Sequence, residues 1–158
     1  MKRPEEVLHR ACLDYLRATL PKPWIVWHTP NGGGRSKAEA GILKAMGVLA
    51  GMPDLFVLGP SGLFTTHDGD PPMSGDELRR SGQYGVAIPH LIAIEFKAPP
   101  KRLRTGGPSK AKPRLSPAQT ARQIDLGACG VPYLVIDDLA DLTQSLKALG
   151  VPLRWRAM

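Results

Sequence analysis

Two short apolar segments of the sequence carry charged residues where a β-strand would begin or end. Asp54 opens one of them, residues 54–58, while Glu95 and Lys97 lie at the end of the other, residues 91–97. Side chains alternate along a strand, so Glu95 and Lys97 share one face and their apolar neighbours share the opposite face. We expect the apolar face to enter the core and the charged face to look into a cleft.

These residue types suit the hydrolysis of a phosphodiester. If the two strands are neighbours, the carboxylates of Asp54 and Glu95 come within reach of one divalent cation. Mg²⁺ takes oxygen ligands and keeps several waters, so two carboxylates and one backbone carbonyl, that of Phe96, are a sufficient protein contribution. Lys97 could position an attacking water, assist its deprotonation or neutralise charge on a phosphoryl transition state.

The elements that must position these residues can be read from periodicity and capping residues. Helices are predicted at residues 4–19, from a Ser36 cap to about Gly47, from a Ser116 cap and Pro117 to 127–130, and from Asp137 or Asp138 to Leu149. Strands are predicted at 24–28, 54–58, 91–97 and 131–136. We expect a single α/β domain over residues 1–158, with a mixed central sheet flanked by helices, because no convincing helix separates the two acid-bearing strands.

Residues 59–90 interrupt this pattern. They contain Gly and Pro turn signals, an acidic patch at 68–76 and a possible helical turn around Glu77 to Arg80. We interpret them as an insertion with little regular structure.

Composition limits the range of partners. The 158 residues carry a net charge of +7, which favours a polyanionic partner, nucleic acid or an anionic membrane surface. No apolar run is long enough to span a membrane and no signal peptide is evident, so we expect a soluble, cytoplasmic protein. Cys12 and Cys129 lack metal-site or disulfide spacing, and we expect two buried, reduced thiols.

Three motifs together resemble one nuclease family. Pro53-Asp54 with Glu95-Phe96-Lys97 resembles the PD-(D/E)XK superfamily, and Gly51-Met52-Pro53-Asp54 with Leu115-Ser116-Pro117-Ala118-Gln119 resembles its VRR-NUC branch. The similarity extends from the first helix to the strand ending at Ile136. It implies a restriction-endonuclease-like core and a DNA endonuclease that uses Mg²⁺ or Mn²⁺. Relatives act on branched DNA such as four-way (Holliday) junctions or flaps, and some are homodimers, which fits a bacterial or phage-encoded protein.

The resemblance also implies further site residues. An acidic residue of the first helix joins the site, which Glu5 matches best and Glu6 second, and Gln119 takes the place of the family's glutamine. Asn31 and Arg35 fall in its polar, glycine-bearing loop, where we expect a substrate contact. The long 59–90 insertion departs from the family's short hairpin.

A run of basic residues separates the Glu-x-Lys strand from the Gln119 helix. Its Gly and Pro residues predict a flexible loop beside the cleft that neutralises phosphates. Its basic residues are Lys101, Arg102, Arg104, Lys110, Lys112 and Arg114. His28 precedes the Asn31 loop, where a DNA contact is possible. Two alternatives stay open: a non-catalytic DNA-binding or assembly protein on a nuclease-like scaffold, and a sequence-reading restriction-type endonuclease.

Overall fold

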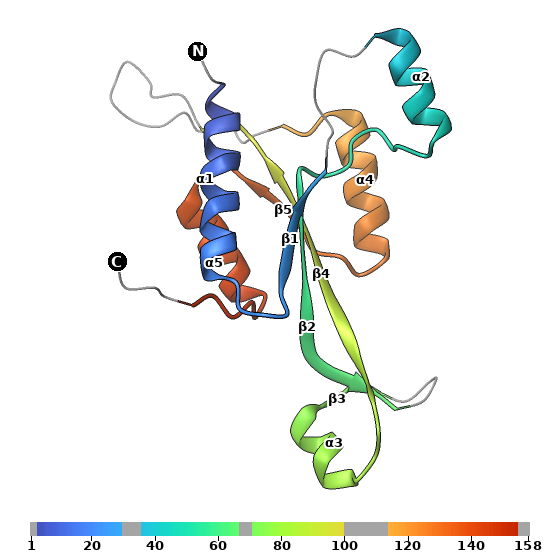
Figure 1. Cartoon of the computed structure of the whole chain (residues 1–158), viewed down its shortest axis with the longest axis vertical. Helices are drawn as coiled ribbons and strands as arrows, with labels where there is room; N and C mark the ends of the chain where they lie inside the picture. Colours follow the sequence, from blue (N-terminus) through green and yellow to red (C-terminus); the bar gives the residue numbers. More distant parts are fainter. Residues whose placement is uncertain (1–2, 30–35, 67–70, 100–113, 155–158) are drawn as a thin grey trace.

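The computed structural model describes residues 3–29, 36–66, 71–99 and 114–154. Helices and strands alternate irregularly along the chain (Figure 1). In order they are α1 (Pro4–Thr19), β1 (Ile25–His28), α2 (Lys37–Ala45), β2 (Leu55–Thr65), β3 (Met73–Ser74), α3 (Gly75–Ser81), β4 (Val86–Phe96), α4 (Pro117–Ala128), β5 (Tyr133–Ile136) and α5 (Leu139–Ala148).

The strands form one mixed sheet in the order β1-β2-β4-β5, and the short β3 pairs with β2 outside this path. β1 and β4 both run antiparallel to β2, whereas β5 runs parallel to β4. The predicted α/β class with a mixed central sheet is therefore confirmed. Antiparallel pairing of β2 and β4 brings the start of one strand beside the end of the other.

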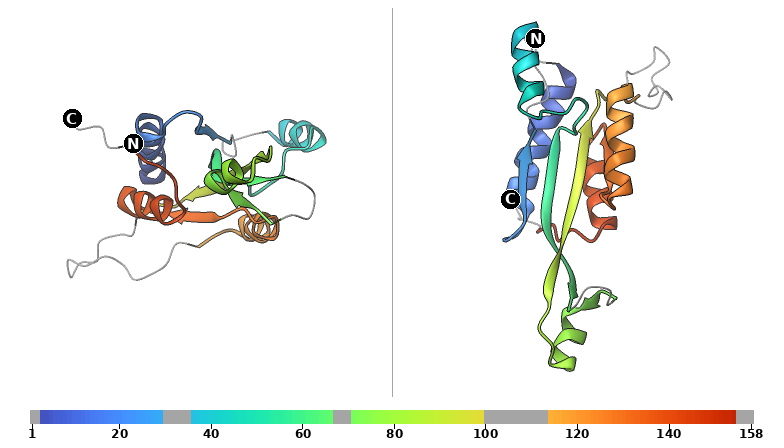
Figure 2. Two further views of the ribbon diagram at one scale, coloured as in Figure 1. Left: turned by 90° about the horizontal axis from the view of Figure 1, so that it is seen from below. Right: turned by 90° about the vertical axis from the view of Figure 1, so that its right-hand side faces the viewer.

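Helices cover both faces of the sheet, with α1 and α5 on one face and α4 on the other (Figure 2). The core lies under α1 and α5, where apolar residues of the helices meet alternate residues of the central strands. These fully buried residues are Cys12, Leu16, Leu55, Val57, Ile92, Ile94, Phe96, Leu142 and Leu146. Burying one such large side chain contributes roughly 1.5–3 kcal/mol, so the core holds β2 and β4 in a fixed register.

The predicted helix starts are confirmed by their caps. Ser36 and Ser116 each form a capping box with the residue three positions on, and Asp138 caps α5 by accepting a hydrogen bond from the Asp141 amide. Each such cap satisfies an amide that the helix itself leaves unpaired.

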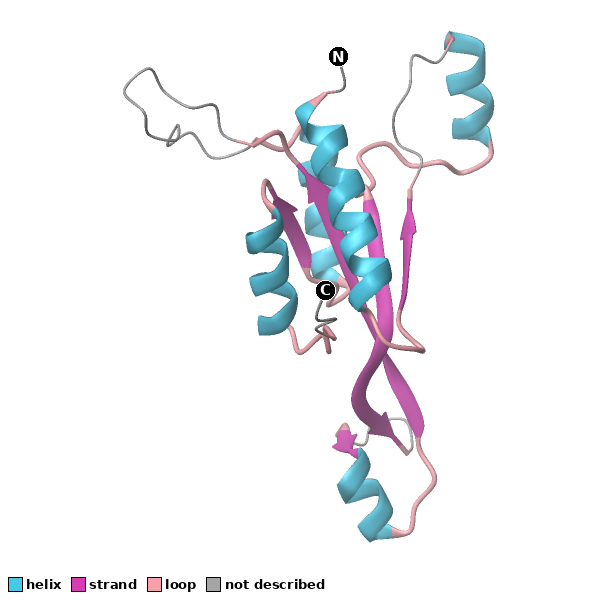
Figure 3. Cartoon of the chain, turned by 60° about the vertical axis from the view of Figure 1, so that its left-hand side comes forward, coloured by secondary structure: helices cyan, strands magenta, loops and turns pink. Residues whose placement is uncertain are grey.

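The prediction of an irregular insertion at 59–90 was wrong. β2 and β4 continue past the helices as a two-stranded ribbon that pairs as far as Thr65 and Val86, with β3 and α3 at its end (Figure 3). We call residues 60–89 the arm. Proline is rare inside strands, yet here Pro60 and Pro89 lie opposite each other, beside an irregularity in the register. The predicted turn at Glu77 is part of α3.

Cys12 and Cys129 differ in exposure. Cys12 is buried in the core, whereas Cys129 is exposed, so the prediction of two buried thiols was wrong for Cys129. It is the C-cap of α4 and lies at the turn that follows the helix. Among the helices that the structure describes, none is both long and apolar enough to cross a membrane.

Candidate active site

The elements that carry the predicted catalytic residues meet at the end of the sheet that lies away from the arm (Figure 1). β2 begins there, β1 and β4 end there, and α1 and α4 begin there. Leu55 pairs with Ile94 in the antiparallel register, so one further step places Asp54 opposite Glu95. Residues opposite each other in such a pair have their Cβ atoms about 5 Å apart, which is the proximity that the sequence predicted.

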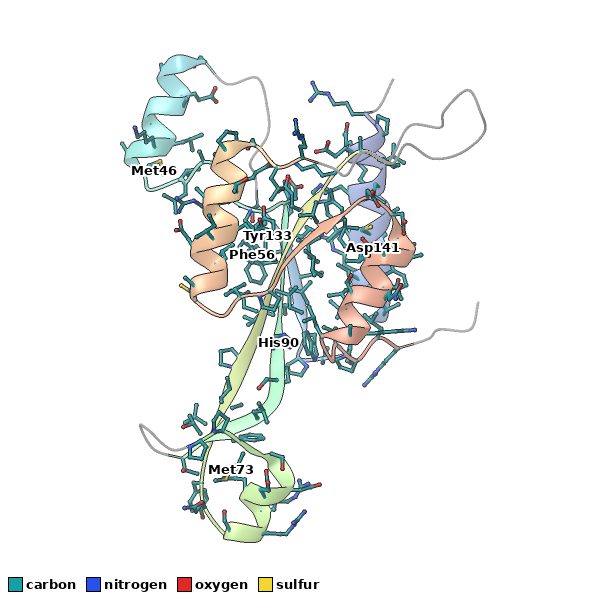
Figure 4. The ribbon with its side chains drawn as sticks, turned by 180° about the vertical axis from the view of Figure 1, so that it is seen from behind. Met46, Phe56, Met73, His90, Tyr133 and Asp141 are labelled. Atoms are coloured by element: carbon teal, nitrogen blue, oxygen red, sulfur yellow. The ribbon has the colours of Figure 1, made fainter. Side chains whose placement is uncertain are left out.

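Glu95 is the centre of a hydrogen-bonded cluster. Its side chain is 2% exposed, and its Oε1 accepts hydrogen bonds from Lys97 Nζ at 2.9 Å and from Gln119 Nε2. Lys97 Nζ also donates to Gln119 Oε1 at 2.9 Å, and Tyr133 Oη donates to Glu95 Oε2 at 3.5 Å. Tyr133 is the first residue of β5, the edge strand that pairs with β4, and its side chain is labelled in Figure 4. Glu95 of β4 and Gln119 of α4 thus hold the Lys97 ammonium between them, while Tyr133 of β5 contacts the other carboxylate oxygen of Glu95.

Gln119 is held by the same capping box that starts α4. Its side-chain Oε1 accepts a hydrogen bond from the backbone amide of Ser116 at 2.9 Å, and its backbone amide donates to Ser116 Oγ at 3.3 Å. Gly51 lets the loop before β2 pack against the first turn of α4. Its φ is +78°, and a Cβ at this position would lie 2.4 Å from the carbonyl carbon of Ala118. Only glycine fits such an approach without strain.

Asp54 is anchored at both its side chain and its backbone. Its Oδ2 accepts a hydrogen bond from the Phe96 amide at 2.9 Å. Its carbonyl oxygen accepts from the Thr29 amide and lies 2.9 Å from His28 Nδ1. A carbonyl can only accept, so this bond requires the proton on Nδ1 and fixes the orientation of the His28 ring.

The carboxyl groups act on one another electrostatically. Burial raises the pKa of Glu95 to about 7 against the lowering effect of the Lys97 hydrogen bond, and repulsion by Asp54 and Glu5 adds to the rise. Burial also raises the pKa of Tyr133, with repulsion by Glu95 second. A cation placed among these carboxylates would relieve their repulsion.

An open cleft of about 810 Å³ lies along α1 and reaches Asp54 and His28. Glu5 and Glu6 line it, whereas Glu95, Lys97 and Gln119 do not. The charged face of β4 therefore lies beside this cleft and does not line it. The first turn of α4 covers that face because Gln119 bonds to both charged groups and Gly51 lets the loop pack closely.

The structure joins four of the five predicted catalytic residues by hydrogen bonds or a shared strand end: Asp54, Glu95, Lys97 and Gln119. Glu5 is exposed at the cleft, and its charge acts on Glu95. Glu6 pairs with Arg10 at 3.3 Å, which leaves Glu5 the freer first-helix acid.

Most of the predicted DNA-contacting residues lie outside the described residues. This holds for Asn31, Arg35, Lys101, Arg102, Arg104, Lys110 and Lys112. Arg114 is described and is exposed, three residues before α4 begins.

His9 and the contact of His28 with Asp54 were not predicted from the sequence. The His9 ring lies on α1, 4.8 Å from the His28 ring and 4.9 Å from the Phe96 ring between centroids. Burial lowers the pKa of His9, opposed by the Asp54 carboxylate. His9 follows Glu5 by one helical turn, so the spacing of four indicated a shared face. Nothing local in the sequence indicated that His28 would bond the Asp54 carbonyl.

The donor set fits a hard divalent cation as a partial site. Asp54, Glu95 and the Phe96 carbonyl offer oxygen atoms, which Mg²⁺ and Mn²⁺ prefer. Within the described ranges, no three side chains of the acid, histidine or cysteine type are arranged to enclose a metal ion. Because Mg²⁺ keeps several waters, a site of two carboxylates needs no such enclosure.

Comparison of the chain with protein-family models, with curated proteins and with solved structures found no match.

Proposed function

We propose that the chain is a divalent-metal-dependent DNA endonuclease with a restriction-endonuclease-like core of the VRR-NUC type, selective for branched DNA such as four-way junctions or flaps. One observation carries the proposal: the hydrogen-bonded cluster of buried Glu95 with the partly buried Lys97 and Gln119 lies beside Asp54, which is anchored on the Phe96 amide. A partly buried lysine held between a buried carboxylate and an amide, beside a cleft lined by other carboxylates, is costly for stability. A positive charge held in this place would serve phosphodiester hydrolysis, in which negative charge develops on the phosphoryl group.

Each residue of the site has a different proposed role. Asp54, Glu95 and the Phe96 carbonyl would hold Mg²⁺ or Mn²⁺, which when bound polarises the phosphoryl oxygens. Lys97 orients the attacking water or neutralises charge that develops on phosphorus. Gln119 positions Lys97 by accepting a hydrogen bond from its ammonium group, and Glu5 adds a carboxylate from the cleft side.

Metal-dependent cleavage is the direct test of this function. The purified chain is incubated with labelled single strands, flaps, four-way junctions and plain duplex, with Mg²⁺, Mn²⁺ or EDTA. We expect cleavage of a branched substrate with either metal and none with EDTA. Asp54→Asn and Lys97→Ala should each lower the rate by at least about 10²-fold, since the first removes a metal-binding carboxylate and the second removes a transition-state contact. DNA binding should persist in both variants, and full activity in either variant would contradict the assignment.

The two alternatives give different results in the same assay. A non-catalytic DNA-binding or assembly protein would bind the substrates with or without metal and cut none. A sequence-reading endonuclease would cut plain duplex at one fixed sequence regardless of branching. Symmetric cuts in a junction would indicate a homodimer, because paired incisions need two sites related by a two-fold axis.

A further inference from the structure

Three arginines follow one another along α1 at intervals of seven residues. Arg3 is the N-cap, Arg10 lies in the middle and Arg17 lies in the last turn, and all three line the cleft that reaches Asp54. Seven residues make nearly two helical turns, so the three side chains share one side of the helix. At a rise of about 1.5 Å per residue, successive arginines are about 10 Å apart. We call them the arginine row.

The acidic residues of the cleft lie at one end of it, where Arg3 is their neighbour and Arg10 pairs with Glu6. These acidic residues are Glu5, Glu6 and Asp54, all at the end where β2 begins. Arg17 lies about 18 Å along the helix axis from Glu5, and its neighbour in the cleft lining is the apolar Leu13. A helix face that is merely solvated usually alternates the two signs along its length, whereas here no acid lines the cleft beyond Glu6 and the row continues to Arg17.

The arginines are available to a ligand. Arg10 is 64% exposed, and its pair with Glu6 is a surface ion pair at 3.3 Å, which contributes only about 0–1 kcal/mol. Exchanging that weak pair for a phosphate costs little. Arg3 and Arg17 are exposed as well, and a guanidinium group binds phosphate oxygens with two parallel hydrogen bonds.

We propose that the arginine row binds the sugar–phosphate backbone of DNA on one side of the cleaved phosphate, so that α1 guides the strand toward Asp54. The inference rests on the proposed function and adds a binding surface that is separate from the basic segment before α4. Contacts to phosphates set affinity and register without reading the base sequence. The row starts beside the carboxylates at Arg3 and runs past them to Arg17, so it gives the strand a path along α1.

The salt dependence of binding tests the row. Binding of a fluorescent duplex and of a four-way junction is measured by anisotropy, with Ca²⁺ in place of the activating metal. Each phosphate contact to duplex contributes about 0.9 to the slope of log affinity against log salt. We expect Arg10→Ala/Arg17→Ala to lower that slope by about 2, so that wild type loses about tenfold more affinity than the variant between 50 and 200 mM salt.

The matched control removes two arginines from another helix. Arg79→Ala/Arg80→Ala changes the same charge on α3, at the far end of the arm (Figure 1), and should leave affinity and slope unchanged. Arg10→Lys/Arg17→Lys keeps the charge and should retain most of the slope. Thermal unfolding establishes that each variant folds, which exposed substitutions should permit.

Failure of this inference differs from failure of the proposed function. If wild type binds and cleaves DNA but Arg10→Ala/Arg17→Ala binds with an unchanged slope, only the row is refuted. If wild type shows no metal-dependent cleavage, the proposed function fails. Binding of wild type to phosphatidylserine vesicles, but not to DNA, would assign the row to a membrane surface and overturn the inference.

Discussion

The Glu95 carboxyl group lies under α4 with 2% of its side chain exposed, and burial raises its pKa from an ordinary 4.5 to about 7. Between these pH values the folded chain holds a proton that the unfolded chain has released. The contribution of Glu95 to stability is therefore complete below about pH 4.5 and is lost as the pH rises through 7. At neutral pH the ionised Glu95 carboxylate therefore lowers the free energy of unfolding of the chain.

Replacing the Glu95 carboxyl group with an uncharged amide should raise stability and abolish activity. Glu95→Gln keeps the size and the acceptor oxygen but cannot ionise. We expect the free energy of unfolding of the variant, relative to wild type, to improve by about 1–3 kcal/mol between pH 5 and pH 8, while cleavage is lost. Urea unfolding in EDTA at several pH values measures the difference. Asp14→Asn, at an exposed position of α1, is the control, and parallel pH profiles for Glu95→Gln and wild type would contradict the burial cost.

Residues whose structure depends on near neighbours could be predicted from the sequence. Ser116 and Gln119 are three positions apart, so the capping box that orients Gln119 could be read directly. Asp54 and Glu95 could be paired because two apolar strands in one sheet have few ways to bury their faces. The burial of Glu95 could not be predicted from the sequence, because it depends on α4 packing over β4. The contact from His28 to Asp54 could not be predicted either, because it spans 26 positions.

At the scale of elements, the loop before β2 sets the position of the first turn of α4. Gly51 and Gly47 flank this loop, and both have positive φ angles, +78° and +87°. A Cβ at Gly51 would lie 2.4 Å from the Ala118 backbone, whereas a Cβ at Gly47 would meet nothing within 4 Å. A substitution at Gly47 would therefore cause backbone strain alone, whereas a substitution at Gly51 would cause backbone strain and also displace the first turn of α4.

We expect Gly51→Ala to reduce both stability and activity, and Gly47→Ala to reduce stability alone. Each pays roughly 1 kcal/mol for a side chain at positive φ, but only Gly51→Ala pushes against Ala118 and displaces the neighbouring Gln119. A displacement of about 1 Å can cost about 10²-fold in rate. Thermal unfolding and single-turnover cleavage measure the two effects separately. Equal losses of cleavage in both variants would show that the contact between the loop and α4 does not position the site.

At the scale of the whole molecule, the arm and the candidate active site lie at opposite ends of one sheet (Figure 3). No described residue of the arm is buried, and the core is complete without it. The arm exposes apolar side chains, with Tyr84 at 96% and Val86 at 73% exposure. Its stability therefore depends on the ladder between β2 and β4 more than on packing, which explains why a pattern of buried residues could not reveal it.

Removing the arm should leave the fold and the chemistry intact. Gly59 and His90 are partners in the β2–β4 register, so an Asn-Gly turn can replace residues 60–89 and close the strands as a hairpin. We expect the shortened chain to unfold cooperatively, at a temperature within a few degrees of wild type, and to cleave the best substrate at a rate within about threefold, because no core or candidate site residue is removed. Circular dichroism during heating and the metal-dependent cleavage assay measure both properties. A folded chain that has lost cleavage of every substrate would instead assign the arm a direct part in binding DNA.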